Sequence, residues 1–246
     1  MIQGNGSAPG RALWRLAFLL GAAWAVAANA GTFSISPIRV ELGAAQRTAV
    51  LTVHNEEDRP VVVQATVLAW KQAGGEDQTD ATHDLLVTPP VFTIGPNADQ
   101  VLRVALRGQP DPTRELDYRL LLAEVPGPPE QGFTGLRLAL RLRLPIFVTP
   151  ARAAPHLDWR LERAADGALS LVAENSGNQH LQLSDFRLRF GDDAHAMHVG
   201  VMRYVLPGSR ASWPVTLPEG ADTAAALSVQ GFGDQGAFEA SVATVH

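Results

Sequence analysis

The segment Leu136-Arg137-Leu138-Ala139-Leu140-Arg141-Leu142-Arg143-Leu144 carries the strongest structural signal in this chain of 246 residues. Its leucines recur at every second position. Because successive side chains of a β-strand point to opposite faces, this period predicts a strand with five leucines on one face and the arginines on the other.

Similar short runs of alternating apolar residues, separated by Gly, Pro, Asn and Asp, fill the chain on both sides of this segment. After residue 30 no stretch keeps a helical period, so the sequence predicts an all-β fold. The candidate strands are residues 33–42, 48–55, 60–70, 85–94, 100–107, 118–125 and 135–149, followed by 156–162, 169–175, 181–190, 197–204, 209–217, 225–230 and 237–245. Residues 74–84 are polar and contain glycine, and we expect an exposed loop there.

A proline-bounded segment of small residues, Thr149-Pro150-Ala151-Arg152-Ala153-Ala154-Pro155, separates the two sets of strands. Seven candidate strands precede it, which is typical of an immunoglobulin-like sandwich of roughly 100 residues. We therefore expect two immunoglobulin-like β-sandwich domains, residues 31–150 and 151–246, with the boundary at this segment.

The first 30 residues have the features of a cleaved secretory signal peptide. Arg11 and Arg15 precede an apolar run, residues 16–28, which ends in the small-residue pattern Ala28-Asn29-Ala30. The run is short for a membrane span, so we expect export to the periplasm without membrane insertion. The chain has no cysteine, which excludes disulfides and thiolate metal sites, and its formal net charge of −5 does not suggest nucleic acid binding.

Sequence motifs of common enzymes are absent. The chain has no Gly-x-Ser-x-Gly nucleophile motif, no His-Glu-x-x-His and no phosphate-binding glycine loop. His195 and His198 form the only close histidine pair, and on a strand that spacing places them on opposite faces. We expect no catalytic residue, no cofactor and no metal, and hence no enzyme.

The leucine face of residues 136–144 has two interpretations. It is either the buried face of an ordinary half-exposed strand, or the face of an edge strand offered to another chain. In the second case the binding mode is β-augmentation, in which backbone hydrogen bonds join the chains and alternate side chains fill pockets of the partner.

Several motifs, in this order, resemble the periplasmic pilus-assembly chaperones of the chaperone–usher pathway. They are Ser36-Pro37-Ile38-Arg39-Val40, Thr88-Pro89-Pro90, Ile94-Gly95-Pro96-Asn97, Val101-Leu102-Arg103-Val104, the segment from Tyr118 to Pro126, and Leu144-Pro145-Ile146-Phe147-Val148. The start of the segment at Tyr118 and the Leu-Pro-Ile-Phe-Val ending look more like the branch that serves spore-coat-U-type subunits.

The resemblance implies two immunoglobulin-like domains at an angle, with pilus subunits of the spore-coat-U type and an outer-membrane usher as partners. It implies that an arginine and a lysine grip the subunit's C-terminal carboxylate in the cleft between the domains. Arg39 lies where the family arginine is expected. The lysine position holds Pro145, and Lys71 is the only lysine, so Arg143 and Arg119 are the candidates for the second cation.

The resemblance also implies that the alternating strand is lent to the subunit, whose own sandwich lacks a strand. The predicted donor residues are Leu136, Leu138, Leu140, Leu142 and Leu144. The alternative function is a secreted adhesive or structural β-sandwich protein of a surface fibre. A carbohydrate-binding adhesin would be expected to expose aromatic residues, whereas Trp70, Trp159 and Trp213 lie in alternating patterns that favour core positions.

Overall fold

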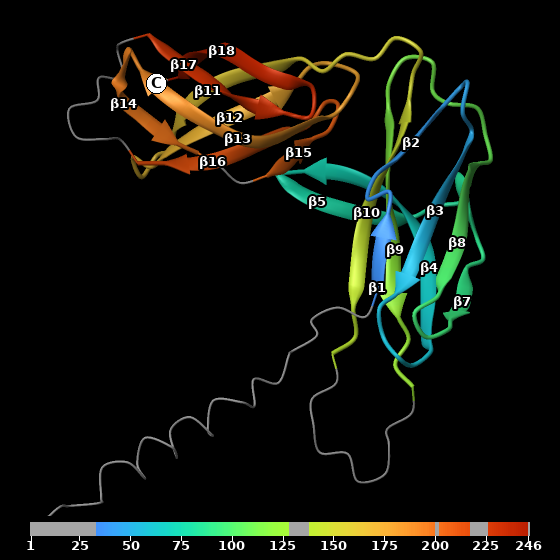
Figure 1. Ribbon diagram of the computed structural model, residues 1–246. Coiled ribbons are helices and arrows are strands. Elements are labelled where there is room, and N and C mark those ends of the chain that lie inside the picture. The colour runs from blue at the N-terminus through green and yellow to red at the C-terminus, as the bar shows by residue number, and fades with distance from the viewer. Residues whose placement is uncertain (1–32, 128–137, 200–201, 217–225, 246) are drawn as a thin grey trace, which may run out of the picture.

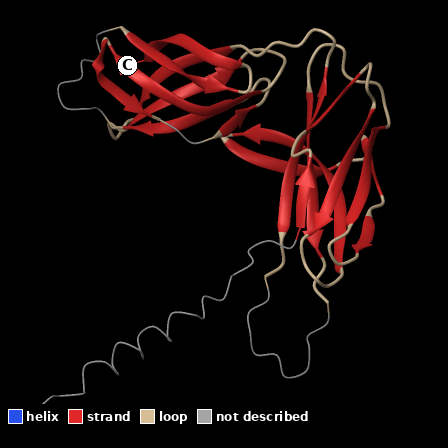
Figure 2. Ribbon diagram, viewed as in Figure 1, coloured by secondary structure: helices blue, strands red, loops and turns tan. Residues whose placement is uncertain are grey.

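The computed structural model describes residues 33–127, 138–199, 202–216 and 226–245. Every regular element within these ranges is a β-strand, and the strands form two sandwiches set at an angle to one another (Figures 1 and 2). The predicted all-β, two-sandwich fold is therefore confirmed. The predicted signal peptide, residues 1–30, and the first predicted donor residue, Leu136, lie outside the described residues.

Two sheets form the first sandwich. One has the strand order β1 (Phe33–Ser36), β3 (Thr48–Asn55), β8 (Asp99–Leu106) and β6 (Leu85–Thr88). The other has the order β2 (Val40–Gly43), β10 (Arg141–Thr149), β9 (Leu116–Glu124), β4 (Val61–Ala73) and β5 (Glu76–Ala81), with β7 (Val91–Ile94) also paired to β4. Leu51, Leu102, Leu120 and Ile146 are among the buried side chains between the sheets.

The strand predicted at residues 33–42 is divided in two. β1 pairs with β3 in one sheet, whereas β2 lies parallel to β10 in the other. Pro37 stands between them, and because proline lacks the backbone N–H that a strand ladder needs, the chain leaves the first sheet there and joins the second. This crossing places Arg39 immediately before β2.

The loop predicted at residues 74–84 is largely a strand, and that prediction was wrong. β5 pairs with the end of β4 in a hairpin, whose turn contains Gly74 and Gly75 at φ angles of 61° and 84°. Positive φ at both central residues is what a two-residue hairpin turn of type I′ requires. All six residues of β5 are exposed, so the strand has no apolar face and its sequence carries no alternation.

The second sandwich comprises β11 (Leu157–Arg163), β12 (Leu169–Asn175), β13 (Leu181–Phe190), β14 (Asp192–His198), β15 (Arg203–Val205), β16 (Arg210–Val215), β17 (Leu227–Gly233) and β18 (Gly236–Val245). The strand order is β14-β13-β17-β18-β11-β12-β16, and β15 pairs with β13. Trp159 and Trp213 are buried in its core, as expected, and pack around Phe186.

The predicted domain boundary, after residue 150, remains a prediction. It lies between β10 and β11, which belong to different sheets and to separate apolar cores. Within the described ranges, no helix has the length and apolar character needed to cross a bilayer.

Each sandwich contains one fully buried asparagine at the end of a strand. Asn55 ends β3 and Asn175 ends β12. The Asn55 side-chain amide donates to the carbonyl of Arg59, and that of Asn175 donates to the carbonyls of Gln179 and Val205. In both cases the side-chain oxygen accepts from the backbone N–H two residues later. These bonds satisfy the buried amide and fix the turn that follows the strand.

Candidate functional site

The leucine face of residues 138–144 emerges gradually from the core of the first sandwich. Leu144 is only 5% exposed and is a core residue. Leu142 and Leu140 are partly buried and pack against that core, and Leu138 is 80% exposed. The apolar ridge therefore begins inside the domain and ends in solvent, and Leu144 is not available to a partner in this state.

Strand β10 has an edge that is open along part of its length. On one side it pairs with β9 from Arg141 to Val148. On the other side β2 pairs only with residues 146–149, so the described part of the chain supplies no strand beside residues 141–145. An unpaired edge next to protruding leucines is the arrangement that β-augmentation uses.

The three candidate arginines gather around Pro145 on the sheet face that points away from the core. Arg119 on β9 is directly opposite Pro145. Arg39 lies on the other side, because it precedes Val40, which pairs with Ile146. Arg143 is two residues from Pro145 on the same strand and therefore on the same face. The structure thus brings all three arginines to the position where the family lysine was expected.

Arg39 is held by one acid from each domain. Its Nη1 lies 2.9 Å from Oδ2 of Asp234, in the turn between β17 and β18, and its Nε lies 3.1 Å from Oε1 of Glu41. Burial opposes ionisation of Asp234, but the neighbouring His180 and a hydrogen bond from the backbone N–H of Gln182 outweigh it and lower the pKa of this carboxyl. Asp234 is therefore charged at neutral pH.

The surroundings of Arg119 and Arg143 differ. The Arg119 guanidinium lies 3.4 Å above the Trp70 ring, and its Nη2 lies 3.3 Å from Oδ2 of Asp77. Burial lowers the pKa of Arg119, although Asp77 opposes this shift. Arg143 is exposed, and no described residue forms a hydrogen bond or ion pair with it. Arg119 is thus engaged by the protein itself, whereas Arg143 is available.

A small apolar cluster joins the two domains behind these arginines. Trp70 and Phe147 come from the first domain, and Tyr204 and Leu206 come from the second. The ring of Phe147 lies 6.1 Å from that of Trp70 and 5.6 Å from that of Tyr204. Trp70 is buried as predicted, but in this interface and not in a sandwich core.

The β4–β5 hairpin also contacts the second domain, through polar groups. Gln72 donates to the carbonyl of Tyr204 and accepts from the N–H of Leu206. The guanidinium of Arg203 donates to the carbonyl of Gly75 at the hairpin turn. Figure 1 shows the turn end of the β4–β5 hairpin next to β15. These contacts join the long hairpin of one domain to the short strand of the other.

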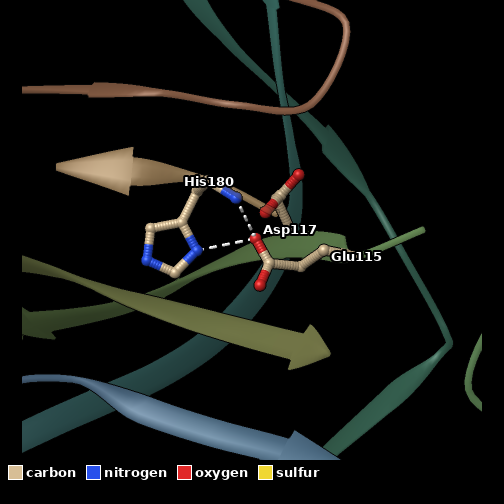
Figure 3. A group of neighbouring side chains, drawn as sticks. All are labelled: Glu115, Asp117 and His180. Atoms are coloured by element: carbon tan, nitrogen blue, oxygen red, sulfur yellow. Dashed lines mark hydrogen bonds and ion pairs between the residues drawn. The ribbon is translucent and has the colours of Figure 1, made fainter. Parts of the chain in front are cut away.

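A buried polar cluster of Glu115, Asp117 and His180 lies in the same interface (Figure 3). Nδ1 of His180 is 2.6 Å from Oε1 of Glu115, and the His180 backbone N–H donates to the same oxygen at 2.9 Å. Thr149 donates its hydroxyl to Glu115. Nε2 of His180 lies 3.3 Å from Oδ2 of Asp234. The imidazole therefore stands between two carboxylates, one from each domain.

Burial and charge act in opposite directions on His180. Burial disfavours the imidazolium, but Asp234 and Glu115 favour it more strongly and raise the pKa of His180 to about 9. Burial, followed by the neighbouring Glu115, raises the pKa of Asp117 to about 8. At neutral pH His180 is therefore positive and Asp117 is neutral. The spacing of these side chains alone does not identify a metal site, and the hydrogen bonds described within the cluster join only His180 and Glu115.

Sequence reasoning missed Glu115, His180 and Asp234. One signal was available: Glu115 and Asp117 are separated by two positions at the start of a strand, so they share a face, and two acids on a face that is not fully solvated call for a cation. The partners come from 65 or more residues away in the chain, and no local pattern marks them.

Comparison with known proteins places the chain in a family. Residues 32–154 match the family described as "Pili and flagellar-assembly chaperone, PapD N-terminal domain", and the chain belongs to this family. It is 29% identical over 123 residues to the chaperone protein FimB/FhaD of Bordetella pertussis, which covers 47% of this chain and spans only half of that protein's length. It is 27% identical over 164 residues to the chaperone protein LpfB of Salmonella typhimurium, covering 64% of this chain and 68% of that one.

The fold also matches solved structures. The chaperone–tip adhesion subunit complex CsuC–CsuE, from the archaic chaperone–usher Csu pili of Acinetobacter baumannii, matches with a TM-score of 0.69 and 19% identity. This match covers 88% of our chain and all of that one. The resemblance to pilus-assembly chaperones is thus confirmed at the level of the family, which is one of chaperones and not a class of enzymes.

Proposed function

We propose that this protein is a periplasmic chaperone that caps pilus subunits by lending them the edge of β10, and then delivers them to an outer-membrane usher. The observation that carries the proposal is the open edge of residues 141–145 beside a ridge of leucines that rises out of the core. Exposed apolar edges promote aggregation and are normally suppressed, so a functional occupant accounts for this one. Membership of the chaperone family supports the same conclusion.

The donor residues in this proposal are Leu138, Leu140 and Leu142, continued by Leu136. Burying a leucine contributes about 1.5–3 kcal/mol, so even partial burial of several leucines offsets a good part of an association cost of about 4–15 kcal/mol. Leu144 supports the strand from inside the domain.

The proposed carboxylate anchor consists of Arg39 and Arg143, with Arg119 beside them. A free carboxylate accepts two parallel hydrogen bonds from a guanidinium fork, which fixes its position as well as its charge. Arg143 is exposed next to Arg119, which already stacks on Trp70. An anchored terminus sets the register of the added strand, since a slip of one residue would turn the arginines toward the partner's pockets.

The proposed partners are subunits with an incomplete sandwich, of the spore-coat-U type suggested by residues 118–126 and 144–148. The Csu chaperone, which this fold resembles, was crystallised with a tip adhesion subunit of an archaic pilus. The process is stoichiometric and needs no nucleotide. The signal peptide at residues 1–30 is proposed to bring the chain to the periplasm.

Co-expression in a bacterial periplasm with the pilus subunits encoded near this gene tests the proposal. Wild type, Arg39→Ala and Leu138→Glu are purified, and captured subunits are identified by mass spectrometry. Val50→Glu is the matched control, because Val50 is also an exposed apolar strand residue but lies on β3 in the other sheet. We expect capture by wild type and control and loss in the two other variants. Capture that survives both changes would refute strand donation and favour an adhesive or structural fibre protein.

A further inference from the structure

We propose that His180 and Asp234 are positioning residues for Arg39, so that the second domain sets the strength with which the first domain grips a subunit's carboxylate. The inference rests on the proposed function and extends it. It assigns a role in subunit capture to a buried histidine outside the donor strand.

A continuous chain of polar contacts links the domains. Glu115 binds Nδ1 of His180 at 2.6 Å, Nε2 of His180 lies 3.3 Å from Oδ2 of Asp234, and the same oxygen is 2.9 Å from Nη1 of Arg39. Oδ1 of Asp234 accepts from the backbone N–H of Gln182, which fixes the carboxylate in the second domain. One carboxylate oxygen of Asp234 is therefore shared between a buried imidazole and the proposed anchor.

His180 itself has little freedom to move. It is 3% exposed, and its ring stacks on Phe147 with the centroids 3.5 Å apart. Its backbone N–H is also tied to Glu115. A change in its charge therefore acts on the neighbouring acids without a large movement of the ring.

The charged and titratable groups around His180 come from several elements. They are Glu115 before β9, Asp117 on β9, Asp234 after β17, Tyr204 on β15, and Arg39 beyond Asp234. Glu115 and Asp234 are the acids in contact with the imidazole, and Asp117 is the neutral neighbour. The two contacting carboxylates are what hold His180 positive in a buried site.

The charge of His180 determines how much positive charge Arg39 has left for a ligand. With His180 positive, Asp234 divides its negative charge between two cations. With His180 neutral, the whole charge of Asp234 acts on Arg39, which already contacts Glu41. Two acids against a single guanidinium would leave little attraction for an incoming carboxylate. A positive His180 therefore keeps the anchor available.

The test uses the full chain and the pilus subunit that wild type captures. The subunit is diluted from urea onto immobilised wild type, Arg39→Ala, His180→Gln, Asp234→Asn and the double variant His180→Gln/Asp234→Asn, and capture is measured from pH 6.5 to 9.5. We expect wild type to weaken as the pH rises through about 9. We expect the affinity of His180→Gln for the subunit at pH 7 to be roughly tenfold lower than that of wild type. We expect this affinity to change little with pH.

The double variant separates positioning from a merely structural role. Removing the Asp234 charge should restore capture in the His180→Gln background, because the acid that His180 balanced is gone. The proposed role of His180 is refuted if His180→Gln captures the subunit with wild-type affinity. It is also refuted if the double variant captures more weakly than either single variant. If His180→Gln does not fold, the pH series on wild type and Asp234→Asn decides, since the pH response must disappear in Asp234→Asn.

Failure of the proposed function gives a different result. If Arg39→Ala captures the subunit as well as wild type, the proposed carboxylate anchor is wrong, and the proposed role of His180 and Asp234 in positioning it is wrong as well. If Arg39→Ala loses capture while His180→Gln keeps it at every pH, the carboxylate anchor is supported and only the positioning role of His180 is refuted.

Discussion

Replacing Phe147 by alanine should separate the two domains without weakening either of them. Phe147 is fully buried on β10, but it faces the second domain and packs against Tyr204 and His180 of that domain and against Trp70 of its own. The adjacent residue Val148 is equally buried and faces the core of the first sandwich. Two neighbouring positions of one strand therefore belong to two different packing units.

The expected magnitudes differ in size and in where they act. Removing a buried phenylalanine ring costs about 3–5 kcal/mol, and here that loss falls on domain docking. Val148→Ala removes two methyl groups from the core and costs about 2 kcal/mol, which lowers the melting temperature of a domain of this size by roughly 5–10 °C.

Calorimetry and small-angle X-ray scattering of the two variants distinguish these effects. Phe147→Ala should keep the melting temperature of the first domain, and its scattering should show a larger and more variable shape than wild type. Val148→Ala should keep the wild-type shape and lose thermal stability. An unchanged scattering curve for Phe147→Ala, together with a first-domain melting temperature as low as that of Val148→Ala, would refute this division of β10.

Three further predictions concern single side chains. Leu138→Ala removes a leucine that is 80% exposed and should weaken subunit capture by about 5- to 60-fold, or about 1–2.5 kcal/mol, without changing the urea midpoint, whereas Val50→Ala should leave capture unchanged. Asp117→Asn should be more stable than wild type in urea, and its advantage in unfolding free energy should grow from about pH 4 to pH 8 and then level off. The reason is that the pKa of Asp117 is raised to about 8 only in the folded state. An equal advantage at pH 5 and pH 8.5 would contradict this. Gly231→Ala would bring a Cβ within 2.4 Å of the Asp185 carbonyl oxygen, so we expect the unfolding free energy of the second domain, measured in urea, to fall by about 3 kcal/mol. A near-wild-type urea midpoint would show that β13 and β17 can move apart.

The all-β class could be predicted from the sequence because most strands have one buried face. A strand with one buried face has apolar residues at every second position. The exceptions have the same physical cause. β5 is exposed on every residue and carries no such period, so its sequence predicts a loop. The split at Pro37 was missed because β1 and β2 each bury alternate residues, and the apolar pattern continues while the sheet changes.

The candidate site was only partly predictable. Arg39 could be named in advance from the resemblance to the chaperone family, and Arg143 from its position on the same strand face as Pro145, with Arg119 as the other candidate. Their different surroundings could not be predicted, because the partners of Arg39 and Arg119 come from Asp234 and from the β4–β5 hairpin. Contacts between domains depend on a relative orientation that no local periodicity encodes.

The two buried asparagines have a consequence for how the halves of this chain should be compared. A core leucine can be exchanged for valine or isoleucine during evolution, so sequence similarity at apolar core positions is lost with time. Asn55 and Asn175 each donate and accept at the same point of a sandwich, and few side chains offer both functions in that shape. If the halves arose by duplication, these two positions are where an alignment of one half on the other should be anchored.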